Sequence, residues 1–517
     1  MIDERYELAV GRIRQMKNEA TVEAPFQDFF YKMADFVLMI DEVRTLITGN
    51  AYSSLSFAEL EEWNHRLYED ILPDRYGTSY GNPTYAARQL GEEYGQILSF
   101  LYTELRGCIA YVFEQKTEYL DILFELLIEI YNQFEEGKPD VGRIKDIIYW
   151  YASDYCDVFA ADRVRVQINP KESFAVDIVN NCALNDLRYL YQFGEYIGEN
   201  ELRTARHLLE LPEDVIQKMA DVYTEGYRMG FVNAGKDLSK KAVVDIRYVL
   251  GFERVIRQAI KNFADMGLKP VLYRAGVSVL TKRGQSKVGY YGGIANKQFE
   301  YDHRNDQALF LDKKFVERKL EVIKTSYEHD KEMARKYAGP ACIDMFGEEP
   351  FIPEQKEEVI KLTKKQEELQ LNFYSRQSQI TNQYIHGDER SFTIISYPVP
   401  EIGDKYEEIF DEIIRINTLD YEKYQKIQQC IILALDEAAA ARDVAHDEAG
   451  VLLGGLHLDG HDGLQDDRVG LAQGVLDGHG AGDLEGGLGG VDLVVGAVGE
   501  GHLDVHDRVA GDDAGLQ

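Results

Sequence analysis

The chain has 517 residues, with 57 Lys or Arg against 90 Asp or Glu, and its formal net charge is −33. This acidic surplus disfavours a nucleic-acid partner, because clustered basic side chains are needed to displace phosphate counterions. The first residues are charged and no run reaches the length of a membrane span, so we expect a cytoplasmic protein with no membrane partner.

Residues 1–320 carry helical periodicity almost throughout and predict a mainly helical N-terminal domain. Residues 113–134 show the pattern: apolar positions such as Leu120, Leu123 and Leu127 recur on one face, and Glu125 and Glu129 fall on the other. Two segments look extended, 271–280 and 287–291, with glycines marking turns.

Residues 321–437 change to an alternation of helix and strand, which is typical of a parallel α/β sheet. The predicted elements are, in order, a charged helix at 315–337, an apolar run at 339–346, a helix after Pro353, a strand at 391–397, and helices around 409–414 and 424–435. These repeats are too few to bury both faces of such a sheet. We therefore expect a truncated α/β domain, the start of a larger unit.

Residues 438–517 use only Ala, Val, Asp, Glu, Gly, Leu, His, Gln and Arg. They hold 19 of the 44 glycines and none of the 33 Tyr or 23 Phe. Glycine at this density loses much backbone entropy on ordering, and no aromatic area offsets that loss. We expect this tail to be poorly ordered.

The tail's residue set also matches the amino acids whose codons begin with G or C, apart from Pro. No physical pressure on a folded chain selects that set, because it cuts across size, charge and polarity. A gene with G or C at its third codon positions gives this set when it is read in phase on the opposite strand. We therefore interpret the tail as antisense or out-of-frame translation joined to a protein that ends near Glu437.

Residues 230–237 nearly match the phosphate-binding loop G-x-x-x-x-G-K-[ST]. Asp237 stands where that motif needs a Ser or Thr for magnesium, and residues 223–229 do not resemble the strand that should precede it. We predict a helix-terminating turn at Gly235 instead.

The tail contains two copies of H-L-D-x-H-D, at 457–462 and 502–507. Imidazole and carboxylate suit zinc or manganese, so the repeat is compatible with metal binding. Reverse-strand reading explains it more simply, because each copy then decodes to the alternating pattern of an ordinary strand. We favour the second interpretation and assign no metal ligand.

The remaining histidines and the cysteines form no motif. No histidine before the tail lies within a few residues of another, and the five cysteines are scattered, which fits reduced thiols. The densest polar cluster is Asp302-His303-Arg304-Asn305-Asp306, which loop polarity explains as well as catalysis does. Catalytic and substrate-binding residues therefore remain unknown from the residues alone.

Several segments resemble the aminopeptidase T family of metallopeptidases, in the long form with a helical N-terminal extension. They are 249–256 (Val-Leu-Gly-Phe-Glu-Arg-Val-Ile), 302–320, 338–350 (Ala-Gly-Pro-Ala-Cys-Ile-Asp-Met-Phe-Gly-Glu-Glu-Pro) and 389–403, the last continuing through 416–421 to 435–437. The resemblance covers about residues 1–437, and 338–437 is its most specific part.

The resemblance implies a cytoplasmic, usually dimeric exopeptidase that removes N-terminal residues from peptides. It also implies two divalent metal ions, of the zinc, cobalt or manganese class, with a metal-bound water as nucleophile and a carboxylate moving the proton. All of the family's metal ligands and its catalytic carboxylate lie downstream of the position matching Glu437, so no catalytic residue transfers to this chain.

Three hypotheses follow. The first is an aminopeptidase-type protein broken before its metal site and inactive as written, with no metal expected in this chain. The second is a non-catalytic helical scaffold or interaction module. The third is a protein that binds metal through the tail histidines.

Overall fold

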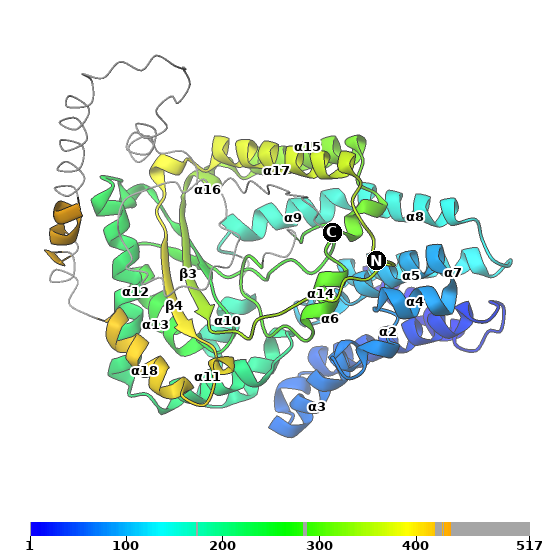
Figure 1. The fold of residues 1–517 in the computed structure, drawn as a ribbon, viewed down its shortest axis with the longest axis horizontal. Helices are drawn as coiled ribbons and strands as arrows, with labels where there is room; N and C mark the ends of the chain where they lie inside the picture. Colours follow the sequence, from blue (N-terminus) through cyan, green and yellow to red (C-terminus); the bar gives the residue numbers. More distant parts are fainter. Residues whose placement is uncertain (1, 172–173, 283–286, 419–425, 428, 436–517) are drawn as a thin grey trace, which may run out of the picture.

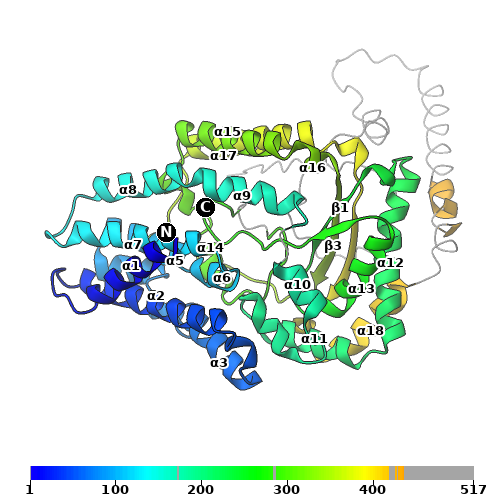
Figure 2. The ribbon, with the colours of Figure 1, turned by 180° about the vertical axis from the view of Figure 1, so that it is seen from behind.

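The computed structural model describes residues 2–171, 174–282, 287–418, 426–427 and 429–435. Within these residues the fold is mainly helical with a small parallel sheet, which confirms the predicted class (Figure 1). The first helices lie on one side of the molecule, and the sheet with its covering helices lies on the other (Figures 1 and 2). The predicted tail at 438–517 lies outside the described residues.

The helical body is built from short amphipathic helices that share one apolar core. Its helices are α1 (Ile2–Met16), α2 (Phe26–Thr48), α3 (Phe57–Tyr68), α4 (Pro83–Leu90), α5 (Glu92–Leu105), α6 (Cys108–Phe113), α7 (Thr117–Phe134), α8 (Val141–Asp154), α9 (Cys156–Ile168), α10 (Phe174–Asn181) and α11 (Glu199–Glu210). Single 3-10 turns join them at Tyr52–Ser54, Glu69–Ile71 and Tyr76–Thr78, and a longer one spans Leu187–Phe193.

Helix α7 confirms the predicted apolar stripe. Leu120, Leu123 and Leu127 are buried, while Glu129 on the opposite face is exposed. Burying each leucine contributes about 2 kcal/mol, so this face holds the helix against its neighbours. Helix α3 begins where Ser56 and Glu59 form a reciprocal capping box, which satisfies its first backbone N–H groups.

The sheet has four parallel strands in the order β2-β1-β3-β4. They are β1 (Val243–Arg247), β2 (Lys269–Val271), β3 (Tyr337–Phe346) and β4 (Thr393–Pro398). Strands β1 and β2 precede residue 320, and β1 pairs with β3, so both parts of the chain contribute to one sheet.

The helices after α11 include those that cover the sheet. They are α12 (Glu213–Asn233), α13 (Glu253–Asp265), α14 (Lys297–Asp302), α15 (Lys313–His329), α16 (Lys331–Arg335), α17 (Lys364–Tyr384) and α18 (Tyr406–Asn417), with 3-10 turns at Leu238–Lys240, Asp306–Leu309, Gly387–Glu389 and Pro400–Ile402. Helices α12, α13 and α18 contact the strands on one side, and α9 contacts β1 and β2 on the other. Helices α15 and α17 run side by side above α9 (Figures 1 and 2).

Several predicted boundaries were wrong. The extended segment at 271–280 leaves the sheet after Val271, because a turn closes from Ser278 to Thr281 and Gly276 packs directly against the Thr281 carbonyl. Of 287–291, only Tyr290 and Tyr291 form isolated bridges. The single charged helix expected at 315–337 is divided into α15, which ends at His329, and the short α16, which ends at Arg335. The helix expected after Pro353 begins only at Lys364, where Thr363 caps it.

Candidate functional site

The order of the strands points to one end of the sheet. The chain passes from β1 outward to β2, and from β3 in the opposite direction to β4. In open parallel sheets ligands bind outside the carboxyl ends of the strands where this direction reverses. Here the reversal falls between β1 and β3; Arg247 is the last residue of β1, and Asp344 lies two residues before the end of β3.

Asp245 is the most buried charge near this position, with no exposed surface. Its Oδ2 accepts hydrogen bonds from Arg247 Nε at 2.9 Å, Tyr337 OH at 2.9 Å and Tyr273 OH at 3.3 Å. Its Oδ1 is buried and has no hydrogen-bond partner among the described residues. Burial opposes the charge on Arg247, but Asp245 outweighs it and raises the pKa of the guanidinium well above its ordinary value. Asp245 and Arg247 therefore form a fixed ion pair within β1, and the hydrogen bond from Tyr337 ties this pair to β3.

Cys342 lies beside this ion pair on β3 and is partly buried. Burial is the main cause that raises the pKa of its thiol to about 12; Arg247 opposes this shift, and Asp245 and Asp344 support it. A nucleophilic cysteine needs a depressed pKa, because the thiolate is the reactive form. The end of the sheet is thus a packed polar cluster without an activated nucleophile on Cys342.

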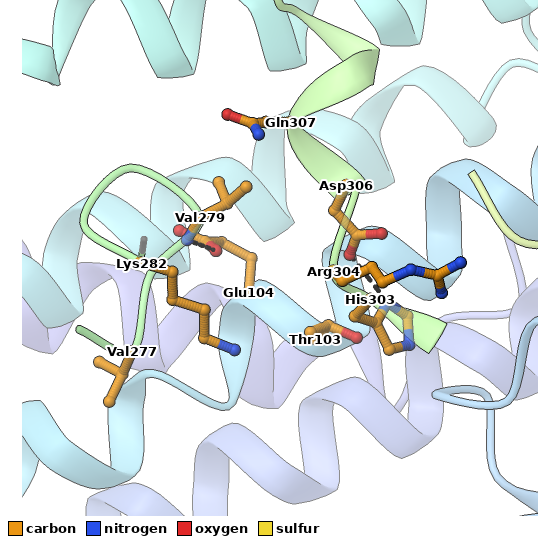
Figure 3. A pocket seen from close by; sticks show the side chains of 9 residues that line it. All are labelled: Thr103, Glu104, Val277, Val279, Lys282, His303, Arg304, Asp306 and Gln307. Carbon is orange, nitrogen blue, oxygen red and sulfur yellow. Dashed lines mark hydrogen bonds and ion pairs between the residues drawn. The ribbon is translucent and has the colours of Figure 1, made fainter. Parts of the chain in front are cut away.

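A second polar region lies where the loop after β2 packs on α5 (Figure 3). It encloses a cavity of about 30 Å³, which is room for about one water molecule. The side chains around it come from α5, from the loop at 277–282 and from 303–307, and the Arg304 guanidinium points away from the cavity (Figure 3).

Glu104 of α5 is the buried acid of this region. Its carboxylate accepts hydrogen bonds from Tyr151 OH at 2.6 Å, from the Ser278 hydroxyl and from the Val279 backbone N–H at 2.9 Å. Burial raises the pKa of Glu104, and these hydrogen bonds counter the shift. Because all three donors come from other segments, Glu104 anchors the loop after β2 onto α5 and α8.

His303 belongs to the polar cluster that the sequence analysis identified. Its Nδ1 lies 2.8 Å from Asp306 Oδ2, and its Nε2 lies 2.6 Å from the Gly81 carbonyl oxygen. Both partners are acceptors, so both ring nitrogens donate only in the imidazolium form. Burial opposes that charge, but Asp306 and the Gly81 carbonyl raise the pKa of His303 above 6.5. Because both ring nitrogens of the charged His303 donate hydrogen bonds, neither is free to accept a proton as a base. His303 instead holds residues 303–306 to the backbone at Gly81.

Asp302, next along the chain, joins a different network. Its Oδ2 accepts from Lys356 Nζ at 2.6 Å and from Tyr76 OH at 2.6 Å, and its Oδ1 accepts from Gln298 Nε2 at 2.7 Å. The Lys356 and Asp302 side chains are only 5 % and 0 % exposed. Lys356 Nζ also donates to Asn82 Oδ1 at 2.9 Å. Of the two explanations for the predicted cluster, the geometry favours loop anchoring over catalysis.

The near-match to the phosphate-binding loop is a helix end, as predicted. Residues 223–229 lie inside α12, and the chain leaves the helix through Gly235, whose φ is +64°. The Gly235 and Lys236 N–H groups donate to the Val232 and Phe231 carbonyls, which closes the last turn. The side-chain Nζ of Lys236 donates a hydrogen bond to the Arg390 carbonyl oxygen at 2.7 Å.

The described residues do not fit a two-metal centre. Among them, no group of three or more His, Cys, Asp or Glu side chains is placed to hold a metal ion. The tail pairs His457/His461 and His502/His506 lie outside the described residues. No reaction step through a metal follows from the residues at hand.

The buried acids Glu104 and Asp245 were missed at the sequence level, although a weak signal was present. Each is a single charge inside an apolar run, within 97–105 and 243–246 respectively. A lone charge in such a run is buried only when another segment supplies donors, and their identity depends on tertiary packing.

Comparisons with protein-family models, with curated proteins and with solved structures found no match to this chain. Among the residues that the structure describes, every helix is too short or too polar to cross a membrane.

Proposed function

We propose that this chain is an aminopeptidase-related protein, consisting of a helical extension at 1–320 and the first part of an α/β peptidase domain at 321–437. The observation that supports this most is where the resembling segments lie. Residues 249–256 lead from β1 into α13, 338–350 contain β3 except for its first residue, and 389–403 contain β4. Three segments that are far apart in sequence thus meet at one parallel sheet, and 302–320 anchor the neighbouring loops.

Within this proposal the substrates of the intact family are peptides, cleaved at their N-terminus with the help of two divalent metal ions. The resemblance places every metal ligand beyond the position of Glu437. We therefore propose that the chain as written does not hydrolyse peptides, and that 438–517 are antisense or out-of-frame translation. The cytoplasm is the proposed compartment, supported by five free thiols.

Hydrolysis by the purified full-length chain tests the catalytic part. Leucine p-nitroanilide is supplied with Zn²⁺, Co²⁺ or Mn²⁺ in separate reactions, and chelator-treated protein is the control. We expect no nitroaniline release above the protein-free rate. Release that requires the metal and stops with chelator would overturn the proposed inactivity.

A single long DNA read across the codons for residues 435–445 tests the junction. A confirmed junction, with an opposite-strand gene over the tail codons, supports a genuine truncation. A frame that continues into a metal-binding half would contradict the truncation and identify the natural protein as an active peptidase.

The second candidate function is a non-catalytic scaffold that self-associates as a homodimer. It is favoured by the helical residues 426–427 and 429–435, which expose large aliphatic side chains by 43–64 %. These are Ile427, Ile431, Ile432, Leu433 and Leu435. Sedimentation should then give a dimer for the wild type and a monomer for Ile431→Asp. A monomeric wild type at high micromolar concentration would exclude this candidate.

A further inference from the structure

A larger cavity lies beside the one in Figure 3, between the helical body and the loop that follows β2. Its volume is about 120 Å³. A cavity of about 150 Å³ accommodates benzene, so this one suits a ligand of up to about six non-hydrogen atoms. Its apolar wall includes Ile71, Ile109, Val277 and Phe299. The two cavities share Thr103, Val277 and Lys282.

Five charged side chains line this cavity, and both carboxylates among them already have partners. Glu195 forms an ion pair with the buried Arg274 and accepts a hydrogen bond from the Gly292 N–H at 3.3 Å. Glu300 pairs with Lys282 across 3.6 Å. Both carboxylates of the lining are therefore paired with cationic side chains of the protein.

The other two cations, Arg106 and Lys287, have no carboxylate within ion-pair distance among the described residues. Arg106 donates to the Leu67 carbonyl at 2.8 Å and lies 5.4 Å from the centre of the Tyr68 ring. Lys287 lies 5.4 Å from the centre of the Tyr291 ring. Neither contact neutralises the charge, so an excess of positive charge faces a partly apolar space.

We propose that this cavity binds a small carboxylate anion with a short apolar body. The carboxylate would accept hydrogen bonds from Arg106 and Lys287, and the body would contact Ile109 and Val277. A carboxylate is favoured over a cation because the lining has unpaired positive charge and no free negative charge. It is favoured over inorganic phosphate because the wall formed by Ile71, Ile109, Val277 and Phe299 is apolar and gives a fully hydrated anion no donors there.

Ligand-observed saturation-transfer NMR on the full-length chain tests the proposal, with propionate as the probe. Propionamide, which has the same shape without the charge, is the matched ligand control, and all samples contain the same NaCl concentration. We expect saturation transfer and a saturable titration for propionate but not for propionamide. Equal binding of both, binding of neither, or binding of phosphate without propionate would each overturn the proposal.

Variants then place the site. Lys287→Gln removes one charge-assisted hydrogen bond and should weaken propionate binding about tenfold or more. Lys240→Gln, at a lysine that is 68 % exposed and remote from the lining, should leave it unchanged. Unfolding curves of both variants check that each is folded. Propionate binding that survives Lys287→Gln and Arg106→Gln in folded protein would show that the anion binds elsewhere. The test involves no hydrolysis, so its outcome is independent of the proposed peptidase relationship.

Discussion

At the scale of single residues, the molecule is unusual in how many acids it buries at the joints between segments. Glu253, in the first turn of α13, is fully buried and accepts hydrogen bonds from Tyr189 OH at 2.8 Å and from the Gly251 N–H at 2.9 Å. Burial raises its pKa to about 7, and the hydrogen bond from Tyr189 only partly opposes the shift. Such a group makes stability depend on pH.

We predict that Glu253→Gln removes part of this pH dependence. Between the ordinary pKa of 4.5 and the folded value of about 7, the folded protein keeps a proton that the unfolded chain has released. The free energy of unfolding therefore falls as pH rises through this window, by about 3 kcal/mol in total for this group. Urea unfolding at several pH values should show a correspondingly flatter profile for the variant. Glu210→Gln, at an exposed position, should follow the wild type. Parallel profiles for all three proteins would contradict the assignment.

At the scale of elements, the segment between β3 and α17 is held to the helical body by Lys356. We predict that Lys356→Met costs about 3 kcal/mol of unfolding free energy, because it leaves the Asp302 carboxylate buried without its cation. Lys331→Met provides the control, since its pair with Glu328 is solvent-exposed and should contribute little to the unfolding free energy. Equal losses in the two variants, measured by urea unfolding, would mean that Lys356 is not an anchor.

Gly339 gives a second test, of the joint between β3 and its neighbours. The β1–β3 register shifts between Val243 and Asp245, opposite Gly339, whose φ is +109°. A Cβ at Gly339 would lie 1.7 Å from the Ser391 carbonyl oxygen, whereas one at Gly235, also at positive φ, would meet nothing within 4 Å. Gly339→Ala should therefore cost about 3 kcal/mol or more, and Gly235→Ala about 1 kcal/mol. Similar unfolding midpoints for both variants would contradict the bulge geometry.

The elements also show what the sequence alone could predict. Helix α7 was predicted from apolar residues that recur every three to four positions, and strand β4 from a run of β-branched and aromatic residues that ends at a proline; both signals are local. The sheet order was not predicted, because β1 pairs with a strand that begins about ninety residues later and no local pattern encodes that partner. The polar cluster at 302–306 was found, but its role was not, because Gly81 and Lys356 complete it from distant segments.

At the scale of the whole molecule, the described residues share one apolar core. It extends from Tyr6 in α1 to Ile414 in α18 and includes residues from both the helical body and the sheet. Buried ion pairs and hydrogen bonds of Arg274, Glu104 and Lys356 also join segments that are far apart in the sequence. We therefore expect the helical body and the sheet to unfold together as one cooperative unit.

Removing 438–517 should leave that unit intact. We predict that a chain ending at Glu437 melts within about 2 °C of the full-length protein, because the core and its buried polar contacts lie before residue 418.

Limited trypsin digestion of the full chain should cut first after Arg442, Arg468 and Arg508, since a glycine-rich segment without aromatic residues has little apolar area to bury on folding. Mass spectrometry of the early fragments identifies the cut sites. Resistance across 438–517, or a melting temperature lowered by many degrees on truncation, would mean that the tail folds onto the body and would count against its antisense origin.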